Sequence, residues 1–137
     1  MKTNLITLGV VLVGAMLMGV QMWNIEWNAV RIAGAAIAVA SLALLVLARL
    51  QLGAAFSVRP RAKKLVTTGI YSRVRNPIYV VGEIFLVGVS MLLERWEVLL
   101  LAAALVPLQV VRAKKEEQVL TAAFGEEYLR YKAGTWF

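Results

Sequence analysis

The sequence contains a polar stretch whose residue types could bind a charged ligand beside an apolar surface. Arg75, Asn76 and Pro77 stand just before an apolar run, and Tyr79 and Glu83 lie inside it. Tyr79 and Glu83 are four residues apart, so on a helix they would share one face. Either side chain could accept a proton or orient a reacting group. We therefore treat this stretch as a candidate site for catalysis.

A purely structural interpretation of the same stretch is also open. Pro77 suits the first turn of a helix, where its missing N–H would be unpaired anyway, and Asn76 before it is a good N-cap. Glu83 favours the functional interpretation, because burying an ionisable residue at hydrocarbon depth is energetically costly and by default indicates a functional site. The structural alternative for Glu83 is an interhelical hydrogen bond donated by its protonated carboxyl.

A second polar cluster lies closer to the C-terminus. Its charged and aromatic members are Arg112, Glu116, Glu117, Phe124, Tyr128 and Tyr131. Arg112 and Glu116 are four residues apart and can pair on a helix. Carboxylates accept hydrogen bonds from hydroxyl or amino groups, and aromatic rings can cover a flat ligand or face a cation. The alternative is a solvated amphipathic helix with ordinary salt bridges.

The composition indicates an integral membrane protein. Of the 137 residues, 61% are hydrophobic and 17% are charged, whereas soluble domains are nearer half apolar and a quarter charged. The length predicts one domain, 1–137. Cysteine and histidine are absent, which excludes disulfides, thiolate metal sites, a cysteine nucleophile and a histidine base. We predict no metal site.

The apolar runs predict an all-α fold with about four transmembrane helices. We expect helices at about 3–25, 32–48, 78–93 and 98–111, the last two forming a hairpin, with a loop at 49–77 and a helical tail at 112–137. The first run could instead be a cleaved signal peptide. Gly34 and Ala38 would allow close helix packing, and Gly125 would divide the tail into two helices. Pro107 should kink the fourth helix.

The basic residues predict the orientation in the membrane. Between residues 49 and 76 there are seven Lys or Arg and no acid: Arg49, Arg59, Arg61, Lys63, Lys64, Arg73 and Arg75. The positive-inside rule then places this loop and both termini in the cytoplasm. Since the basic excess is juxtamembrane, we expect anionic lipid rather than nucleic acid as its partner.

The two clusters together resemble a known family. The segments LVTTGIYSRVRNPIYVVGE and RAKKEEQVLTAAFGEEYLRY are similar, in order and spacing, to the isoprenylcysteine carboxyl methyltransferase and phospholipid methyltransferase superfamily. The resemblance covers about residues 53 to 131. It implies a small multi-spanning enzyme that uses S-adenosylmethionine, bound at the cytoplasmic face, and releases S-adenosylhomocysteine.

The resemblance also implies roles for individual residues. The cofactor-binding set would be Arg75, Asn76, Pro77, Tyr79, Glu116, Glu117, Phe124, Tyr128 and Tyr131, and the catalytic set Glu83, Tyr79 and Arg112. Asn76 departs from the carboxyl methyltransferase branch, which usually has His there. Asn-Pro-x-Tyr is more similar to the phosphatidylethanolamine N-methyltransferase branch, and this weakens the case for an isoprenylcysteine substrate.

We therefore expect an integral membrane methyltransferase that acts on a lipid or prenyl-like acceptor. Two alternatives stay open: a relative similar to the NADPH-dependent sterol reductases, and a non-catalytic protein that binds lipid or a partner. The small-residue face makes a homodimer conceivable. The sequence names neither the acceptor nor the atom that is methylated.

Overall fold

The described part of the protein is helical, as the sequence predicts. A computed structural model describes residues 16, 19–23, 25–52 and 65–136. In these residues the helices are α2 (Ala29–Leu52), the short 3-10 helix η2 (Gly69–Ser72), α3 (Pro77–Leu93), α4 (Glu97–Phe124) and α5 (Glu126–Ala133). The predicted helix 3–25 lies mostly outside the described residues, although 16 and 19–22 are helical.

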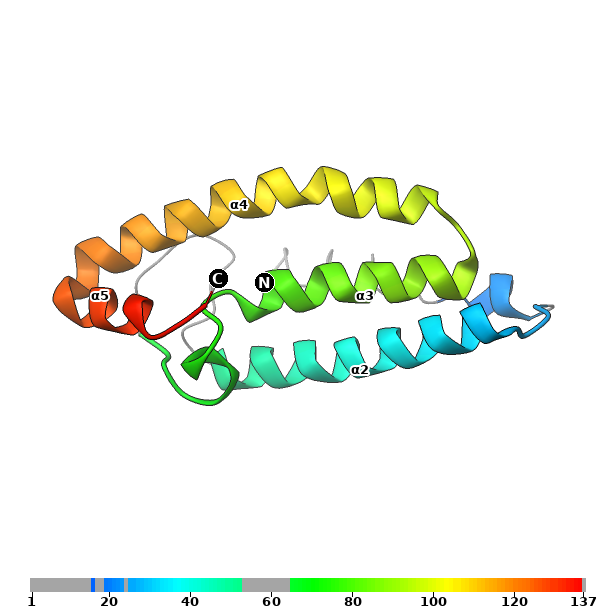
Figure 1. The fold of residues 1–137 in the computed structure, drawn as a ribbon, viewed down its shortest axis with the longest axis horizontal. Coiled ribbons are helices and arrows are strands. Elements are labelled where there is room, and N and C mark those ends of the chain that lie inside the picture. The colour runs from blue at the N-terminus through cyan, green and yellow to red at the C-terminus, as the bar shows by residue number, and fades with distance from the viewer. Residues whose placement is uncertain (1–15, 17–18, 24, 53–64, 137) are drawn as a thin grey trace.

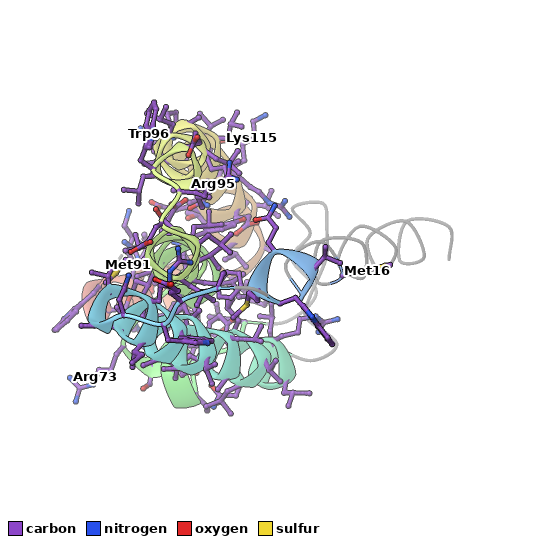
Figure 2. All side chains as sticks on the ribbon, turned by 90° about the vertical axis from the view of Figure 1, so that its right-hand side faces the viewer. Met16, Arg73, Met91, Arg95, Trp96 and Lys115 are labelled. Atoms are coloured by element: carbon purple, nitrogen blue, oxygen red, sulfur yellow. The ribbon has the colours of Figure 1, made fainter. Side chains whose placement is uncertain are left out.

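Three long helices lie in a row with α3 in the middle. In Figure 1, α2 and α4 flank α3, and α5 folds back beneath the end of α4 toward the start of α3. Figure 2 looks along the helices from the end that carries Arg95 and Trp96, and it shows the same order. The hairpin of α3 and α4 therefore returns the second polar cluster to the level of the first.

Small residues bring α2 and α3 close together. A Cβ on Gly34 would lie 2.7 Å from the carbonyl oxygen of Gly88, and one on Gly88 would lie 2.7 Å from the backbone nitrogen of Ala38. Such distances exclude larger side chains, so the predicted use of Gly34 and Ala38 is confirmed. This face is buried within the chain, and it therefore gives no argument for a homodimer.

One described helix is long and apolar enough to cross a membrane. α2 has 24 residues and a mean hydropathy of 2.3, and at 1.5 Å per residue it is about 36 Å long. The apolar helix α3 has 17 residues and measures about 26 Å. The predicted number of four transmembrane helices thus goes beyond what the described residues establish.

The fourth helix does not end where its apolar run ends. We expected it to stop at Val111, but α4 continues to Phe124 through the charged residues. Lys, Glu and Gln are good helix formers, and Arg112 pairs with Glu116 one turn on. The drop in hydropathy after Val111 therefore marks the change from an apolar to a polar environment along α4, and not the end of the helix. The helix also runs through Pro107, and it arches in Figure 1.

Two of the expected helix boundaries are confirmed, but the N-cap contact is not. Pro77 is fully buried in the first turn of α3, and Gly125, with φ 52°, separates α4 from α5. The Asn76 side chain, however, makes no capping hydrogen bond. Its backbone carbonyl instead accepts from the N–H groups of Tyr79 and Val80. The side-chain cap that we expected is therefore wrong.

Charged groups close the hairpin end of the row. The Arg31 guanidinium donates to Glu94 at 2.7 Å and to the Leu92 carbonyl at 3.0 Å. Asn28 donates to the other Glu94 oxygen at 2.8 Å and accepts from the Arg31 backbone. Glu94 itself has a left-handed backbone, with φ 51°, and caps α3. We call Asn28, Arg31 and Glu94 the hairpin clamp.

Candidate active site

The two polar clusters of the sequence meet at the N-terminal end of α3. The Tyr79 hydroxyl donates to Glu116 Oε1 at 2.7 Å, which joins α3 to α4. Arg112 Nε donates to the same oxygen at 3.2 Å, and its guanidinium carbon lies 6.0 Å from the centre of the Tyr79 ring. Glu116 therefore carries two hydrogen bonds on one oxygen. Within the described residues, its Oε2 has no hydrogen-bond partner.

Tyr71, from the short helix η2, lies beside this group. The residue is 5% exposed, yet its hydroxyl makes no hydrogen bond in the part of the chain that the structure describes. Burial raises the pKa of the Tyr71 phenol to about 12, with further contributions from Tyr131 and Glu116 that Arg49 opposes. The buried hydroxyl is thus neutral at physiological pH and able to donate a hydrogen bond.

Helix α5 is joined to η2 by a hydrogen bond from Tyr131. The Tyr131 hydroxyl donates to the Tyr71 backbone carbonyl at 2.6 Å, and the rings of Tyr131 and Tyr128 are 6.0 Å apart. Tyr128 is 3% exposed. Burial raises the pKa of Tyr128, and Glu117 adds to this effect while Arg75 opposes it. Tyr131 therefore contacts Tyr71 directly, and Tyr128 packs against Tyr131.

Glu117 holds the C-terminal segment in place. One of its oxygens pairs with Lys132 on α5, and the other lies 3.5 Å from Arg75. Arg75 Nε also donates to the Trp136 carbonyl at 3.0 Å, and the Trp136 N–H donates to the Arg73 carbonyl at 2.7 Å. We call residues 126–136, which comprise α5 and the segment after it, the C-terminal strap, because they are bonded to Glu117 and to the residues just before α3.

Glu83 lies one turn deeper along α3, between two helices. Its Oε1 accepts a hydrogen bond from Gln109 Nε2 of α4 at 2.7 Å. The interhelical bond of the structural alternative is therefore present, although the donor is the Gln109 amide and not a protonated Glu83. Among described groups, Oε2 of Glu83 has no hydrogen-bond partner, so this carboxylate retains acceptor capacity.

Most of the predicted residues gather at this end, but their contacts differ. Tyr79, Arg112 and Glu116 bond directly, whereas Arg75 and Glu117 belong to the strap. Pro77, Tyr128 and Tyr131 are packing residues of the same region. Asn76 is half-buried without a side-chain bond, and half-buried Phe124 makes no ring contact within the described ranges.

Three residues of this region were absent from the predicted site: Tyr71, Gln109 and Lys132. Tyr71 lies in the segment LVTTGIYSRVRNPIYVVGE that carries the family resemblance, and this could have drawn attention to it. Gln109 is a polar residue within an apolar run, and that is a usable signal. Nothing local distinguishes Lys132, because its pairing with Glu117 depends on how α5 folds back after Gly125.

The arrangement suits a ligand that carries both charges and hydroxyl groups. Tyr71 offers a donor, Arg112 supplies a positive charge, the second oxygen of Glu116 offers an acceptor, and the rings of Tyr128 and Tyr131 lie in the same region. One side of the group leads along α3 to Glu83 and the apolar surface.

A comparison with known families gives a direct result. The profile of the family described as phospholipid methyltransferase matches residues 29–127, a range that includes α2, α3, α4 and the beginning of α5. The comparison with curated proteins found no match. The matched range contains both polar clusters except for the last two tyrosines.

Proposed function

Because the chain belongs to the phospholipid methyltransferase family, we propose that it is an integral membrane enzyme that uses S-adenosylmethionine to methylate a lipid-like acceptor. The family implies methyl transfer to lipid in a membrane. The cofactor, the site and the acceptor go beyond this and form our proposal. The main support from the structure is the bond from Tyr79 to Glu116, which joins the two polar clusters into one group.

The residues present fit this cofactor chemically. S-adenosylmethionine carries hydroxyl groups, an ammonium, a carboxylate, a sulfonium and an adenine ring. Glu116 would accept from a hydroxyl or amino group, and Arg112 would pair with the carboxylate. Tyr128 and Tyr131 would line the site, and Phe124 would cover the adenine or face the sulfonium. The unpartnered Tyr71 hydroxyl agrees with a polar ligand here.

The protein would act mainly by positioning and by excluding water. When bound, S-adenosylmethionine supplies a methyl group whose carbon–sulfur bond breaks as the acceptor's electron pair bonds to that carbon, leaving S-adenosylhomocysteine. Tyr79 would hold Glu116 in place, and Arg112 would hold the cofactor's charged end. Glu83 would orient the acceptor's head group or accept its proton, where the acceptor carries one.

The acceptor would reach this site from the membrane. Glu83 lies within α3, between helices that are largely apolar, whereas Glu116 lies on the charged half of α4. A lipid head group near Glu83 would thus meet a water-soluble cofactor near Glu116. The phospholipid methyltransferase match and Asn76 in place of His both favour a phospholipid over an isoprenylcysteine acceptor.

The site would face the cytoplasm, where the cofactor is made. Arg73, Arg75, Arg112, Lys114 and Lys115 all lie at this end, and the positive-inside rule assigns such an end to the cytoplasm. Both termini would then be cytoplasmic.

The proposed function is tested by transfer of labelled methyl to a lipid extract. Purified protein in vesicles is incubated with methyl-labelled S-adenosylmethionine and membrane lipids, and the labelled product is identified. We expect a labelled lipid with wild type and with Glu126→Gln, whose acid is exposed and pairs only with Arg130 in the described region. No labelled lipid from wild type would refute the proposal.

Glu83→Gln separates the two interpretations of Glu83. The amide keeps the size of the side chain, so the contact with Gln109 can persist. We expect a lower kcat with unchanged affinity for S-adenosylhomocysteine, because Glu83 would act on the acceptor. Full turnover in this variant would assign Glu83 a structural role.

A further inference from the structure

We infer that Tyr71 is a ligand-binding residue, and that its phenol and the Oε2 oxygen of Glu116 together bind one ribose hydroxyl of the cofactor. The inference deepens the proposed function and rests on it. It adds a residue that the predicted site lacked, and it assigns to Glu116, rather than Glu117, the contact with the ribose.

The first observation is the buried hydroxyl of Tyr71. Buried polar groups in proteins are almost always hydrogen-bonded, and each exception calls for an explanation. Tyr71 is 5% exposed, and its hydroxyl has no partner within the described ranges. A ligand that arrives with a hydrogen-bond acceptor would complete this group.

The second observation is that the Tyr71 residue is fixed in place. Its N–H donates to the Thr68 carbonyl at 3.2 Å, and its carbonyl accepts from the Tyr131 hydroxyl at 2.6 Å. Gln51 of α2 accepts from the neighbouring Ile70 N–H at 2.8 Å. The backbone of η2 is thus tied to α2 and to α5, and the phenol itself is kept from water by burial. Such preorganisation favours binding.

The third observation concerns Glu116. Both of its protein donors, Tyr79 and Arg112, bond Oε1, and this leaves Oε2 as an acceptor without a partner among the described residues. Tyr71 lies in η2, just before α3 begins, and Glu116 bonds Tyr79 in the first turn of α3, so a donor and an acceptor are both present at this end of the row. The negative charge of Glu116 also contributes to the raised pKa of the Tyr71 phenol.

A ligand group that accepts from the phenol and donates to the carboxylate must do both at once. A hydroxyl group does so through a single oxygen, whereas an ammonium only donates, a carboxylate only accepts, and adenine donates and accepts through separate atoms. In S-adenosylmethionine the hydroxyl groups are those of the ribose. Each Glu117 oxygen already faces a cation, Lys132 or Arg75, so it is a weaker candidate for this contact than Oε2 of Glu116, which has no partner among the described residues.

Tyr71→Phe tests this inference, with S-adenosylhomocysteine as the probe. The variant removes only the hydroxyl, which makes no protein hydrogen bond among the described groups, so we expect unchanged or slightly higher thermal stability. Calorimetry on detergent-solubilised protein should show about tenfold weaker binding. Ser72→Ala is the matched control on the same short helix, since Ser72 is exposed and bonds only the Gly69 carbonyl in the described part. The control should bind like wild type.

Ribose-deoxy analogues of S-adenosylhomocysteine identify the group that Tyr71 binds. We expect one of the 2′-deoxy and 3′-deoxy analogues to bind wild type about tenfold more weakly, with little further loss in Tyr71→Phe. Equal S-adenosylhomocysteine affinity for wild type and Tyr71→Phe would overturn the inference while leaving the proposed function intact. If, for both analogues, the loss of affinity from Tyr71→Phe is as large as it is for S-adenosylhomocysteine, the ribose assignment is wrong. If wild type fails to bind S-adenosylhomocysteine, both proposals are wrong.

Discussion

Each end of the helix row joins two helices through a glutamate that faces an arginine, but the two ends differ in what remains unbonded. In the hairpin clamp, Arg31 and Asn28 occupy both Glu94 oxygens, and Arg31 also bonds the Leu92 carbonyl. The acceptors there are thus bonded, and the buried group left without a partner in the described part is a donor, Arg31 Nε. At the opposite end, Tyr79 and Arg112 both donate to Oε1 of Glu116, and Oε2 has no hydrogen-bond partner among the described residues. The clamp therefore serves to hold helices together, while the Glu116 end retains the capacity to bind.

The same contrast separates two adjacent glutamates. Glu116 faces α3 and keeps an acceptor oxygen, whereas Glu117 uses both oxygens to fasten the C-terminal strap through Lys132 and Arg75. Sequence alone gives the two acids one role, because they stand side by side. On α4 they point in different directions, and we expect their substitution to have different effects.

The largest predicted effect is that of Glu116→Gln on methyl transfer. The amide keeps its shape but loses the charge that would strengthen a hydrogen bond to the cofactor, so we expect kcat/KM to fall about 50-fold. Thermal stability should stay near that of wild type. Transfer of labelled methyl measures the rate, with Glu126→Gln as a control of the same chemistry. Wild-type kcat/KM in Glu116→Gln would contradict the assignment.

Arg31→Met should have the opposite pattern. Methionine keeps the aliphatic part of a side chain that is 16% exposed, but it leaves Glu94 and the Leu92 carbonyl without their main donor. We expect the free energy of unfolding to fall by about 2 kcal/mol, with S-adenosylhomocysteine affinity unchanged. Thermal unfolding in detergent and calorimetry measure the two quantities. If Arg31→Met binds S-adenosylhomocysteine more weakly but unfolds at the wild-type temperature, our comparison of the two ends is wrong.

Glu117→Gln should have a smaller effect on binding than Glu116→Gln. Its ion pairs are about one-third exposed, so we expect them to contribute about 1 kcal/mol to docking of the strap. Affinity for S-adenosylhomocysteine should fall less than fivefold, or by under about 1 kcal/mol. Hydrogen exchange in residues 126–136 should become faster. Equal losses in the two glutamate variants would remove the distinction between them.

The smallest effect concerns pH and the docking of α5. Burial, aided by Tyr128 and opposed by Arg75, raises the pKa of Tyr131 to about 12 from its ordinary value of 10. The folded state therefore holds this proton more tightly than the unfolded state, and the resulting stability is full below pH 10 and lost as pH rises toward 12. Tyrosine absorbance near 295 nm should show several late-titrating phenols, including Tyr71 and Tyr131, and the amplitude of this late phase should fall by one phenol in Tyr131→Phe. Ionisation of all four tyrosines near pH 10 would contradict this.

Local patterns in the sequence predicted the helical character of the described residues and the pair of Arg112 with Glu116. Pro77 and Gly125 mark real boundaries because their backbone preferences act within one turn. The end of the apolar run at Val111 was a poor guide, because hydropathy reports the surroundings while helix formation depends on the residues themselves. Asn76 does not cap α3 with its side chain, because its backbone does not have the extended conformation typical of N-cap residues.

Contacts between distant segments were harder to predict. Gln109 meets Glu83 because of the register of the α3–α4 hairpin, and Lys132 meets Glu117 because α5 folds back. Neither register nor fold-back follows from spacing within one helix. The unpartnered hydroxyl of Tyr71 is likewise a property of packing, and only the structure reveals it.

Hydrogen exchange with and without S-adenosylhomocysteine tests the central claim most directly, because one experiment follows both ends of the molecule. We predict that the ligand slows exchange in peptides covering 68–80 and 112–132, where the Tyr71, Tyr79 and Glu116 group lies. Exchange in peptides covering 28–34 and 92–97, at the hairpin clamp, should stay the same. Protection confined to the hairpin clamp, or absent from both ends at saturating ligand, would contradict the account.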